Sequence, residues 1–294
     1  MEIRRDEPMA GHVTWRAGGK VAKACFPHDL ADLAAFMATL RHDEPLLMVG
    51  LGSNLLIRDG GFDGTAIFTH GALNALRLET DGTIYAEAGV ASPKVARFAA
   101  NHDFSGAEFL AGIPGTFGGA LAMNAGCHGS EIWQFVERVH MLNRAGTLID
   151  RTPADFAIGY RHCGLKNATD EIFVAAWLRF PPGAAATARA RIRQLLEARI
   201  ATQPLQLPNA GSVFRNPPGD HAARLIEAAG LKGSAMGESG GARVSEKHAN
   251  FIVNPGGGAS ASAIESLIGR IQAAVRDKFG VELVREVRIL GASK

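Results

Sequence analysis

A glycine-rich segment between two apolar runs is the first feature of this chain that indicates chemistry. It consists of Gly50, Leu51, Gly52, Ser53 and Asn54. The apolar run Leu46–Val49 precedes the segment, and Leu55–Ile57 follows it. Glycine permits a positive φ and a close approach of the backbone to a ligand, and exposed backbone N–H groups suit a phosphate. The segment predicts a phosphate-binding loop, with a plain hairpin turn as the alternative. It is not a Rossmann fingerprint, because no third glycine follows at the required spacing.

A second glycine-rich segment, Glu108–Gly126, combines glycine with small and apolar residues. This composition is unfavourable for a surface loop and for a helix, but it suits a close-fitting wall around a flat ligand. Tight packing of a strand against a neighbour is the alternative interpretation. Two such segments in one region indicate an extended ligand that contains a diphosphate.

Composition excludes several other classes of protein. A net charge of +2 is too small to indicate binding to nucleic acid or to an anionic membrane, so we expect neither partner. The three cysteines are far apart and the histidines lack ligand spacing, so we expect no disulfide and no metal site. Because Met1–Glu7 is charged and no run of 18 apolar residues occurs, we expect a cytoplasmic protein without a signal peptide.

The elements that must position these loops alternate between strands and helices. Strand-like runs flank the first loop, and a hairpin is expected at Val136–Asn143 and Thr147–Asp150. Helices are expected from Asp29 to about His42, over Ala184–Ala201, and from Ser260 or Ser262 to Gly280. The sequence therefore predicts mixed helices and strands, with a domain boundary near Pro181–Gly183.

Six sequence motifs together resemble the UDP-N-acetylenolpyruvoylglucosamine reductase family. They are VGLGSNLLIRD, GIPGTFGGALAMNAG, GYR, AGSVFRNP, VSEKHANFIVN and REVRILG, and they occur in the order and spacing of that family from about Trp15 to Gly291. Each motif is weak alone, whereas the six in register are specific.

The resemblance implies an α+β protein with a non-covalent FAD-binding fold of the vanillyl-alcohol-oxidase type. It implies FAD-binding subdomains at 1–72 and 73–183 and a C-terminal α+β substrate-binding domain at 184–282, with the strand 283–294 joining the first subdomain. The first loop, Gly50 to Asn54, would hold the flavin pyrophosphate. The second segment would line the diphosphate and the isoalloxazine from the other side through Ile113, Gly115, Thr116, Gly118 and Gly119.

Three polar residues match the catalytic positions of the family. The resemblance implies that Arg161 pairs with the substrate carboxylate, that Ser212 protonates the substrate carbon, and that Glu286 assists at the carboxylate. Considered without the resemblance, each has an ordinary structural interpretation: a surface or salt-bridging arginine, a turn serine and a solvent-facing strand residue. What favours catalysis is that all three residues lie in motifs that follow the order and spacing of the family.

Substrate contacts are implied for Tyr160, Arg215 and Asn216, whereas Asn250 is interpreted mainly as a structural residue. The chain departs from the family pattern at Cys163, where a serine is common, so a hydroxyl donor is lost there. It also lacks the insertion between Phe180 and Ala210 that carries a tyrosine in longer members. The resemblance therefore implies the shorter form of the enzyme.

The implied activity is NADPH-dependent, FAD-mediated reduction of UDP-N-acetyl-enolpyruvylglucosamine to UDP-N-acetylmuramate for peptidoglycan synthesis. Another FAD-dependent oxidase or dehydrogenase of the same fold is one alternative. A flavin-binding module without catalysis is the other.

Overall fold

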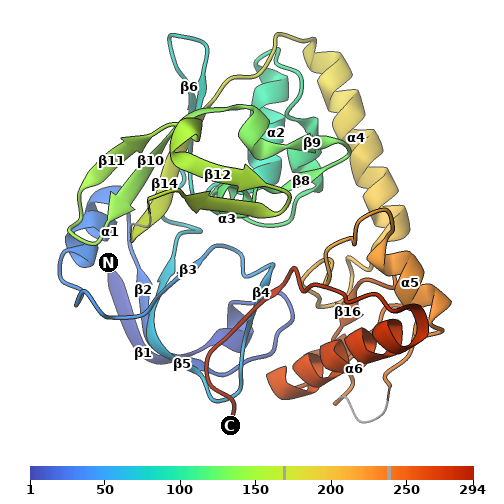
Figure 1. The fold of residues 1–294 in the computed structure, drawn as a ribbon. Coiled ribbons are helices and arrows are strands. Elements are labelled where there is room, and N and C mark those ends of the chain that lie inside the picture. Colours follow the sequence, from blue (N-terminus) through green and yellow to red (C-terminus); the bar gives the residue numbers. More distant parts are fainter. Residues whose placement is uncertain (168–169, 237–239) are drawn as a thin grey trace. The chain divides into compact units, whose positions relative to one another are not determined.

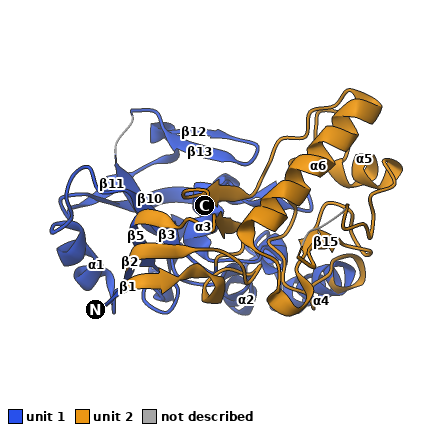
Figure 2. Ribbon diagram, turned by 90° about the horizontal axis from the view of Figure 1, so that it is seen from below, with its two compact units in different colours: residues 1–4, 24–51, 64–199 blue, residues 5–23, 52–63, 200–294 orange. Residues whose placement is uncertain are grey.

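The chain, described by a computed structural model over residues 1–167, 170–236 and 240–294, forms two compact units. Unit 1 comprises residues 1–4, 24–51 and 64–199, and unit 2 comprises residues 5–23, 52–63 and 200–294 (Figures 1 and 2). The chain passes from unit 1 to unit 2 between Leu51 and Gly52, inside the first glycine-rich loop.

The described residues contain α-helices, strands and short 3-10 turns (Figure 1). The helices are α1 (Leu30–Met37), α2 (Ser92–Asn101), α3 (Phe117–Ala122), α4 (Ala185–Thr202), α5 (Ala222–Ala228) and α6 (Ala261–Phe279). The first strands are β1 (Glu2–Pro8), β2 (Lys20–Phe26), β3 (Leu46–Val49), β4 (Leu55–Ile57), β5 (Phe62–Phe68), β6 (Leu76–Leu78), β7 (Ile84–Glu87), β8 (Gly126–Cys127) and β9 (Ser130–Glu131). The later ones are β10 (Val136–Asn143), β11 (Leu148–Arg151), β12 (Phe156–Gly159), β13 (His162–Leu165), β14 (Glu171–Leu178), β15 (Arg243–Val244), β16 (Ile252–Val253) and β17 (Arg288–Leu290). The 3-10 turns are Met9–Gly11, Glu108–Gly112, Ile132–Gln134, Pro153–Asp155 and Pro255–Gly257.

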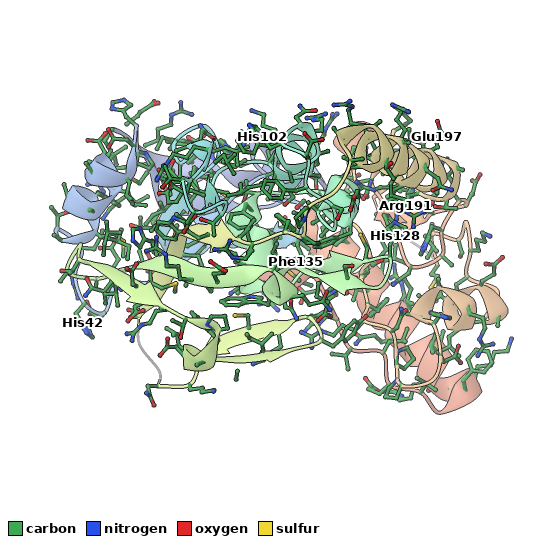
Figure 3. All side chains as sticks on the ribbon, turned by 90° about the horizontal axis from the view of Figure 1, so that it is seen from above. His42, His102, His128, Phe135, Arg191 and Glu197 are labelled. Atoms are coloured by element: carbon green, nitrogen blue, oxygen red, sulfur yellow. The ribbon has the colours of Figure 1, made fainter. Side chains whose placement is uncertain are left out.

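A five-stranded sheet of order β11-β10-β14-β7-β6 is the centre of unit 1. Its neighbouring strands pair in antiparallel fashion, and the hairpin of β10 and β11 confirms the predicted one. Alternate residues of a strand point to opposite faces. Ala176 and Leu178 of β14 accordingly face a core shared with α2, α3 and α4. Phe135 closes this core, with ring centroids 5.9 Å from Phe109 and 4.8 Å from Phe180 (Figure 3).

On the opposite face of this sheet, arginine side chains lie over aromatic rings. Tyr85 and Trp177 pack edge to face with centroids 4.8 Å apart. Arg77 lies over Tyr85 and Arg138 lies over Trp177, each with its guanidinium carbon 3.6 Å from the ring centroid. Cation–π contact of this kind keeps large aromatic side chains away from water without a covering helix.

A second sheet, of order β1-β2-β5-β3, leads the chain to the first glycine-rich loop. Strand β3 runs parallel to β5, with Leu46 opposite Thr65 and Val49 opposite Phe68. Val49 is buried, and Gly50 begins the loop directly after it. The strand thus fixes where the loop starts.

Helix α1 begins as predicted, but it ends earlier. The Asp29 carboxylate accepts the N–H of Asp32 over 2.8 Å, which satisfies a donor of the first turn. The predicted end near His42 is wrong, because the helix ends at Met37. There the N–H groups of Thr39 and Leu40 bond to carbonyls three residues back, a tightening typical of helix ends.

Unit 2 is organised around α6, which presents an apolar face to its core. Its buried residues Ile264, Leu267, Ile268, Ile271 and Val275 recur at helical spacing, as predicted. Ser260 caps the helix by accepting the N–H of Ala263, and Gly280 ends it at φ +69°. The Asp59 carboxylate also accepts the N–H groups of Ala261 and Ser262. Because those two bonds stabilise the carboxylate, the pKa of Asp59 is lowered although burial opposes the shift.

The predicted α+β class is confirmed. Strand β17 pairs in parallel with β4 inside unit 2, with Arg288 opposite Leu55. The boundaries at 72, 183 and 282 stay a prediction. In the described part of the chain, no helix is both long enough and apolar enough to cross a membrane.

Candidate functional site

Gly50, at the start of the first glycine-rich segment, meets the second segment within unit 1. A β-carbon added to Gly50 would lie 2.2 Å from Oγ1 of Thr116, which is far inside van der Waals contact. Gly50 is therefore glycine because the second segment occupies the space a side chain would need. The sequence interpretation assigned that space to a ligand, whereas the structure gives it to Thr116.

The second segment contains a short helix, so the expectation that its glycines disfavour one is wrong. Thr116 precedes α3, and the N–H groups of Phe117 and Gly118 donate to the carbonyls of Val90 and Ala88 over 2.7 and 2.9 Å. A β-carbon on Gly118 would lie 2.7 Å from the β-carbon of Ala88. Tertiary hydrogen bonding and close packing therefore override the low helix propensity of glycine here. Gly119 differs, since a β-carbon added there would lie 3.7 Å from its nearest neighbour, Oγ1 of Thr116, which is an ordinary contact.

The backbone of the first loop fits a phosphate. Among residues 1–167, 170–236 and 240–294, no hydrogen bond from the N–H groups of Gly50, Leu51 or Gly52 is found. Gly52 is buried, and its carbonyl accepts the N–H of Thr14 over 3.2 Å, which holds the loop in place. Backbone N–H groups without an internal acceptor can donate to a diphosphate. The binding of a pyrophosphate at this loop stays a prediction.

Arg161 lies in the two-residue turn between β12 and β13, next to Tyr160. Its backbone is left-handed at φ +53°, which is uncommon for a residue other than glycine or asparagine. Its Nη2 donates to the carbonyl of Gly126 over 2.8 Å, and its guanidinium carbon lies 5.2 Å from the Tyr160 ring centroid. The turn thus holds the Arg161 guanidinium against the β8 backbone, while Tyr160 is 50% exposed.

Asn124 anchors this turn and was missed by the sequence reasoning. It is only 1% exposed, and its Nδ2 donates to the carbonyl of Gly159 over 3.0 Å and to Glu131 Oε2 over 2.8 Å. Its φ of +42° is a conformation that asparagine tolerates better than most residues. The signal available in the sequence was an asparagine between small residues at the end of the second segment.

Two cysteines are close to Arg161 in the fold. Burial raises the pKa of the Cys163 thiol to about 12. Burial also raises the pKa of Cys127, against the opposing charges of Arg161 and Arg199. Both groups remain thiols at neutral pH, so neither provides a nucleophilic thiolate.

Ser212 and Glu286 belong to hydrogen-bonded neighbouring segments of unit 2. The N–H of Glu286 donates to the carbonyl of Val213, the residue after Ser212, over 2.8 Å. The Glu286 carbonyl in turn accepts Nδ2 of Asn54 over 3.3 Å. Both Ser212 and Glu286 are partly exposed. The end of the first loop is therefore connected, within unit 2, to the backbone segments that carry Glu286 and Ser212.

The substrate-binding candidates Arg215 and Asn216 continue the same segment. The N–H of Arg215 donates to the carbonyl of Val284 over 2.9 Å. Oδ1 of Asn216 accepts the N–H of Ala222 over 3.1 Å, so this side chain supports the start of α5. The structure thus gives Asn216 a structural role that the sequence reasoning did not foresee. Ile113 and Gly115 flank Pro114 before α3, and the Gly115 carbonyl accepts the N–H of Ser92.

The structure brings the predicted residues together in three groups. Gly50 lies with Thr116, Tyr160 lies with Arg161, and Asn54 lies with Glu286 and, through it, the segment that carries Ser212. Within the described ranges, no cluster of three His, Cys, Asp or Glu side chains could hold a metal ion.

Comparison with known proteins places this geometry in a family. A model described as an FAD binding domain matches residues 21–152, and one described as the C-terminal domain of UDP-N-acetylenolpyruvoylglucosamine reductase matches residues 203–290. Fold and loop therefore define an FAD-binding protein with a second, C-terminal domain.

Full-length relatives narrow the class. The reductase of that name from Thiobacillus denitrificans is 54% identical over 97% of this chain and 91% of its own length. The one from Nitrosospira multiformis is 52% identical over 99% and 89%. A crystal structure of UDP-N-acetylenolpyruvylglucosamine reductase from Thermus caldophilus matches with a TM-score of 0.81 and 30% identity, covering 98% of each chain. The chain belongs to the UDP-N-acetylenolpyruvoylglucosamine reductase family.

Proposed function

We propose that this protein reduces UDP-N-acetyl-enolpyruvylglucosamine to UDP-N-acetylmuramate with NADPH, in peptidoglycan precursor synthesis in the cytoplasm. The names of its full-length relatives support the reaction. The structural observation that carries the proposal is the hydrogen-bonded path from Asn54 through Glu286 to Val213, beside Ser212. This path joins the backbones of the segments that carry Asn54, Glu286 and Ser212. A carboxylate and a hydroxyl are groups that a reductase of a carbon–carbon double bond needs.

Residues of the two glycine-rich segments would hold the cofactor. The amides of Gly50 to Asn54 would bind the pyrophosphate of FAD, and Ile113, Gly115, Thr116, Gly118 and Gly119 would line its other side. When bound, FAD carries hydride from NADPH to the substrate. The chain's own contribution is to fix the cofactor by backbone groups, which need no charged side chain.

Arg161 would bind the enolpyruvyl carboxylate. A guanidinium presents a planar fork of donors that matches a carboxylate, and it stabilises the negative charge that develops when hydride reaches the vinyl carbon. The bond from Nη2 to the Gly126 carbonyl fixes the position of the guanidinium. Tyr160, Arg215 and Asn216 complete the proposed substrate contacts.

Ser212 would give its hydroxyl proton to the carbon beside the one that receives hydride. A serine hydroxyl is a weak acid, so this step requires an acceptor with carbanion character and close positioning. Glu286 would assist at the substrate carboxylate. Hydride plus this proton accounts for the two hydrogens added across the double bond.

The test is to measure the two half-reactions of Ser212→Ala separately in anaerobic stopped-flow experiments. We expect NADPH to bleach the flavin at close to the wild-type rate. Reoxidation by the enolpyruvyl substrate should slow by a factor of about 100 or more, within the usual range for loss of a general acid. Ser262→Ala, which removes a hydroxyl from the first turn of α6 in the same unit, is the matched control. Equal loss of both half-reactions would contradict the role of Ser212.

A further inference from the structure

Asn250 makes an unusual set of contacts with the residues that follow Ser212. It is 4% exposed. Its Oδ1 accepts the N–H of Phe214 over 3.0 Å, and its Nδ2 donates to the carbonyl of Phe214 over 2.8 Å. Its own carbonyl accepts the N–H of Val213 over 2.9 Å. One residue therefore holds two consecutive residues of the serine segment through three hydrogen bonds.

The turn that carries Asn250 is itself tightly held. Oγ of Ser245 accepts the N–H groups of Lys247 and His248 over 3.1 and 3.3 Å. The N–H of Asn250 donates to Nδ1 of His248 over 3.3 Å, and the His248 ring packs against Phe251 with centroids 4.7 Å apart. The Asn250 side chain thus comes from a rigid turn, so its hydrogen bonds transmit a fixed position.

The segment that Asn250 holds is also the one that meets Glu286. The carbonyl of Val213 accepts the N–H of Glu286, and Phe214 forms an antiparallel bridge with Arg285. Displacing Val213 and Phe214 would therefore alter the position of Ser212 relative to Glu286. Misplacement of a reacting group by about 1 Å costs about 100-fold in rate.

We infer that Asn250 is a positioning residue for Ser212: its side-chain amide, paired with both polar groups of Phe214, holds the serine hydroxyl where it can deliver a proton. This inference rests on the proposed function, because it assigns Asn250 a part in the proton-delivery step. A primary amide is the side chain that offers one acceptor and one donor side by side, which Phe214 requires. Aspartate would place a second oxygen against the Phe214 carbonyl.

Asn254 provides a matched control within the same unit. It is fully buried, its Nδ2 donates to the carbonyl of Trp15 over 2.9 Å, and its Oδ1 accepts the N–H of Ala259 over 3.0 Å. Its two side-chain hydrogen bonds match the two side-chain bonds of Asn250 in number and closely in length, yet they hold other segments. Asn254→Ala therefore removes comparable stability without releasing the residues after Ser212.

The experiment compares Asn250→Ala, Asn250→Asp and Asn254→Ala as flavin-loaded proteins, with melting temperature and both half-reactions measured. We expect Asn250→Ala to reduce flavin with NADPH within about 2-fold of wild type and to slow reoxidation by substrate about 100-fold. Asn254→Ala should melt at a similarly lowered temperature with both half-reactions preserved. Asn250→Asp should recover reoxidation as the pH falls, because the protonated carboxyl can again donate to the Phe214 carbonyl.

Three outcomes would overturn the inference. Equal reoxidation rates in Asn250→Ala and Asn254→Ala at equal stability loss would show that Asn250 is only structural. If Asn250→Ala does not fold, the test relies on Asn250→Asp. Reoxidation of this variant at the wild-type rate at every pH would contradict the positioning role of Asn250. Ser212→Ala is measured in parallel. If Ser212→Ala reoxidises its flavin with substrate at the wild-type rate, the proposed function fails. If reoxidation is slow in Ser212→Ala but at the wild-type rate in the Asn250 variants, only the positioning role of Asn250 fails.

Discussion

Gly50 and Thr116 are in such close contact that a β-carbon on residue 50 would lie 2.2 Å from the threonine Oγ1. The contact joins the two glycine-rich segments within unit 1, between two residues that lie more than 60 positions apart in the sequence. It sets how closely the two proposed cofactor loops approach each other.

Gly50→Ala should push these loops apart. We expect the purified variant to retain much less flavin than wild type, measured as flavin absorbance relative to protein, because backbone donors must keep their spacing to bind a diphosphate. The control is Gly269→Ala in α6, where a β-carbon meets nothing within 4 Å. Full flavin retention by Gly50→Ala would show that the two loops can separate without losing the cofactor.

Gly119→Ala separates a cofactor contact from a packing constraint. The protein has room for this β-carbon, and replacing glycine inside α3 should stabilise the apoprotein by about 0.5–1 kcal/mol. We expect flavin affinity to fall nevertheless, because the added methyl group would occupy space next to the isoalloxazine. Calorimetry of the apoprotein and a flavin titration check the two parts. An unchanged flavin affinity would remove Gly119 from the cofactor site.

Asn124→Ala should disorder the turn that carries Arg161. The variant leaves the Gly159 carbonyl without its donor and places alanine at a positive φ, which together cost about 2–4 kcal/mol. We expect a lower melting temperature and a raised KM for the enolpyruvyl substrate, with the KM for NADPH nearly unchanged. Asn101→Ala at the exposed end of α2 is the control. Equal rises in both KM values would argue against a specific effect on Arg161.

The fold of unit 1 should weaken below neutral pH because of His140. Its Nε2 lies 2.7 Å from Asp150 Oδ1, and its ring packs edge-on against Trp177. Burial lowers its pKa below the ordinary value near 6.5, although Asp150 opposes the shift. The unfolded chain therefore binds this proton more readily, so the stabilisation is complete above about pH 6.5 and is lost as the pH falls through the lowered pKa.

Melting temperature measured between about pH 7.5 and pH 5 should show this loss in wild type. His140→Gln should flatten the pH dependence, whereas His42→Gln, at an exposed position, should retain it (Figure 3). Identical slopes for His140→Gln and wild type would exclude His140 as the source.

Local signals predicted much of the fold from the sequence. The Asp29 and Ser260 caps, the Gly280 terminator and the hairpin of β10 and β11 depend on neighbouring residues, and all are present. The end of α1 was predicted wrongly, because residue spacing does not show the hydrogen-bonded turns that follow Met37. The existence of α3 was missed, because its first N–H groups bond to the carbonyls of Val90 and Ala88, which lie far away in the sequence.

The site was predictable as a set of motifs but not as a set of contacts. The first loop was found from its glycines, whereas the crowding of Gly50 by Thr116 requires a contact across the fold. Asn124 was missed, and Asn250 was interpreted as structural without its partner, for the same reason: each bonds to backbone groups 35 or 36 residues away. A buried asparagine gives no periodic signal, so only the structure identifies its partners.

The central claim is tested most directly by anaerobic titration of the purified protein with NADPH, followed by addition of UDP-N-acetyl-enolpyruvylglucosamine. We predict a yellow protein whose flavin absorbance is bleached by NADPH and returns when the substrate is added, with UDP-N-acetylmuramate as the product. A colourless protein that takes up no FAD, or a bleached flavin that this substrate leaves reduced and oxygen alone restores, would contradict the account.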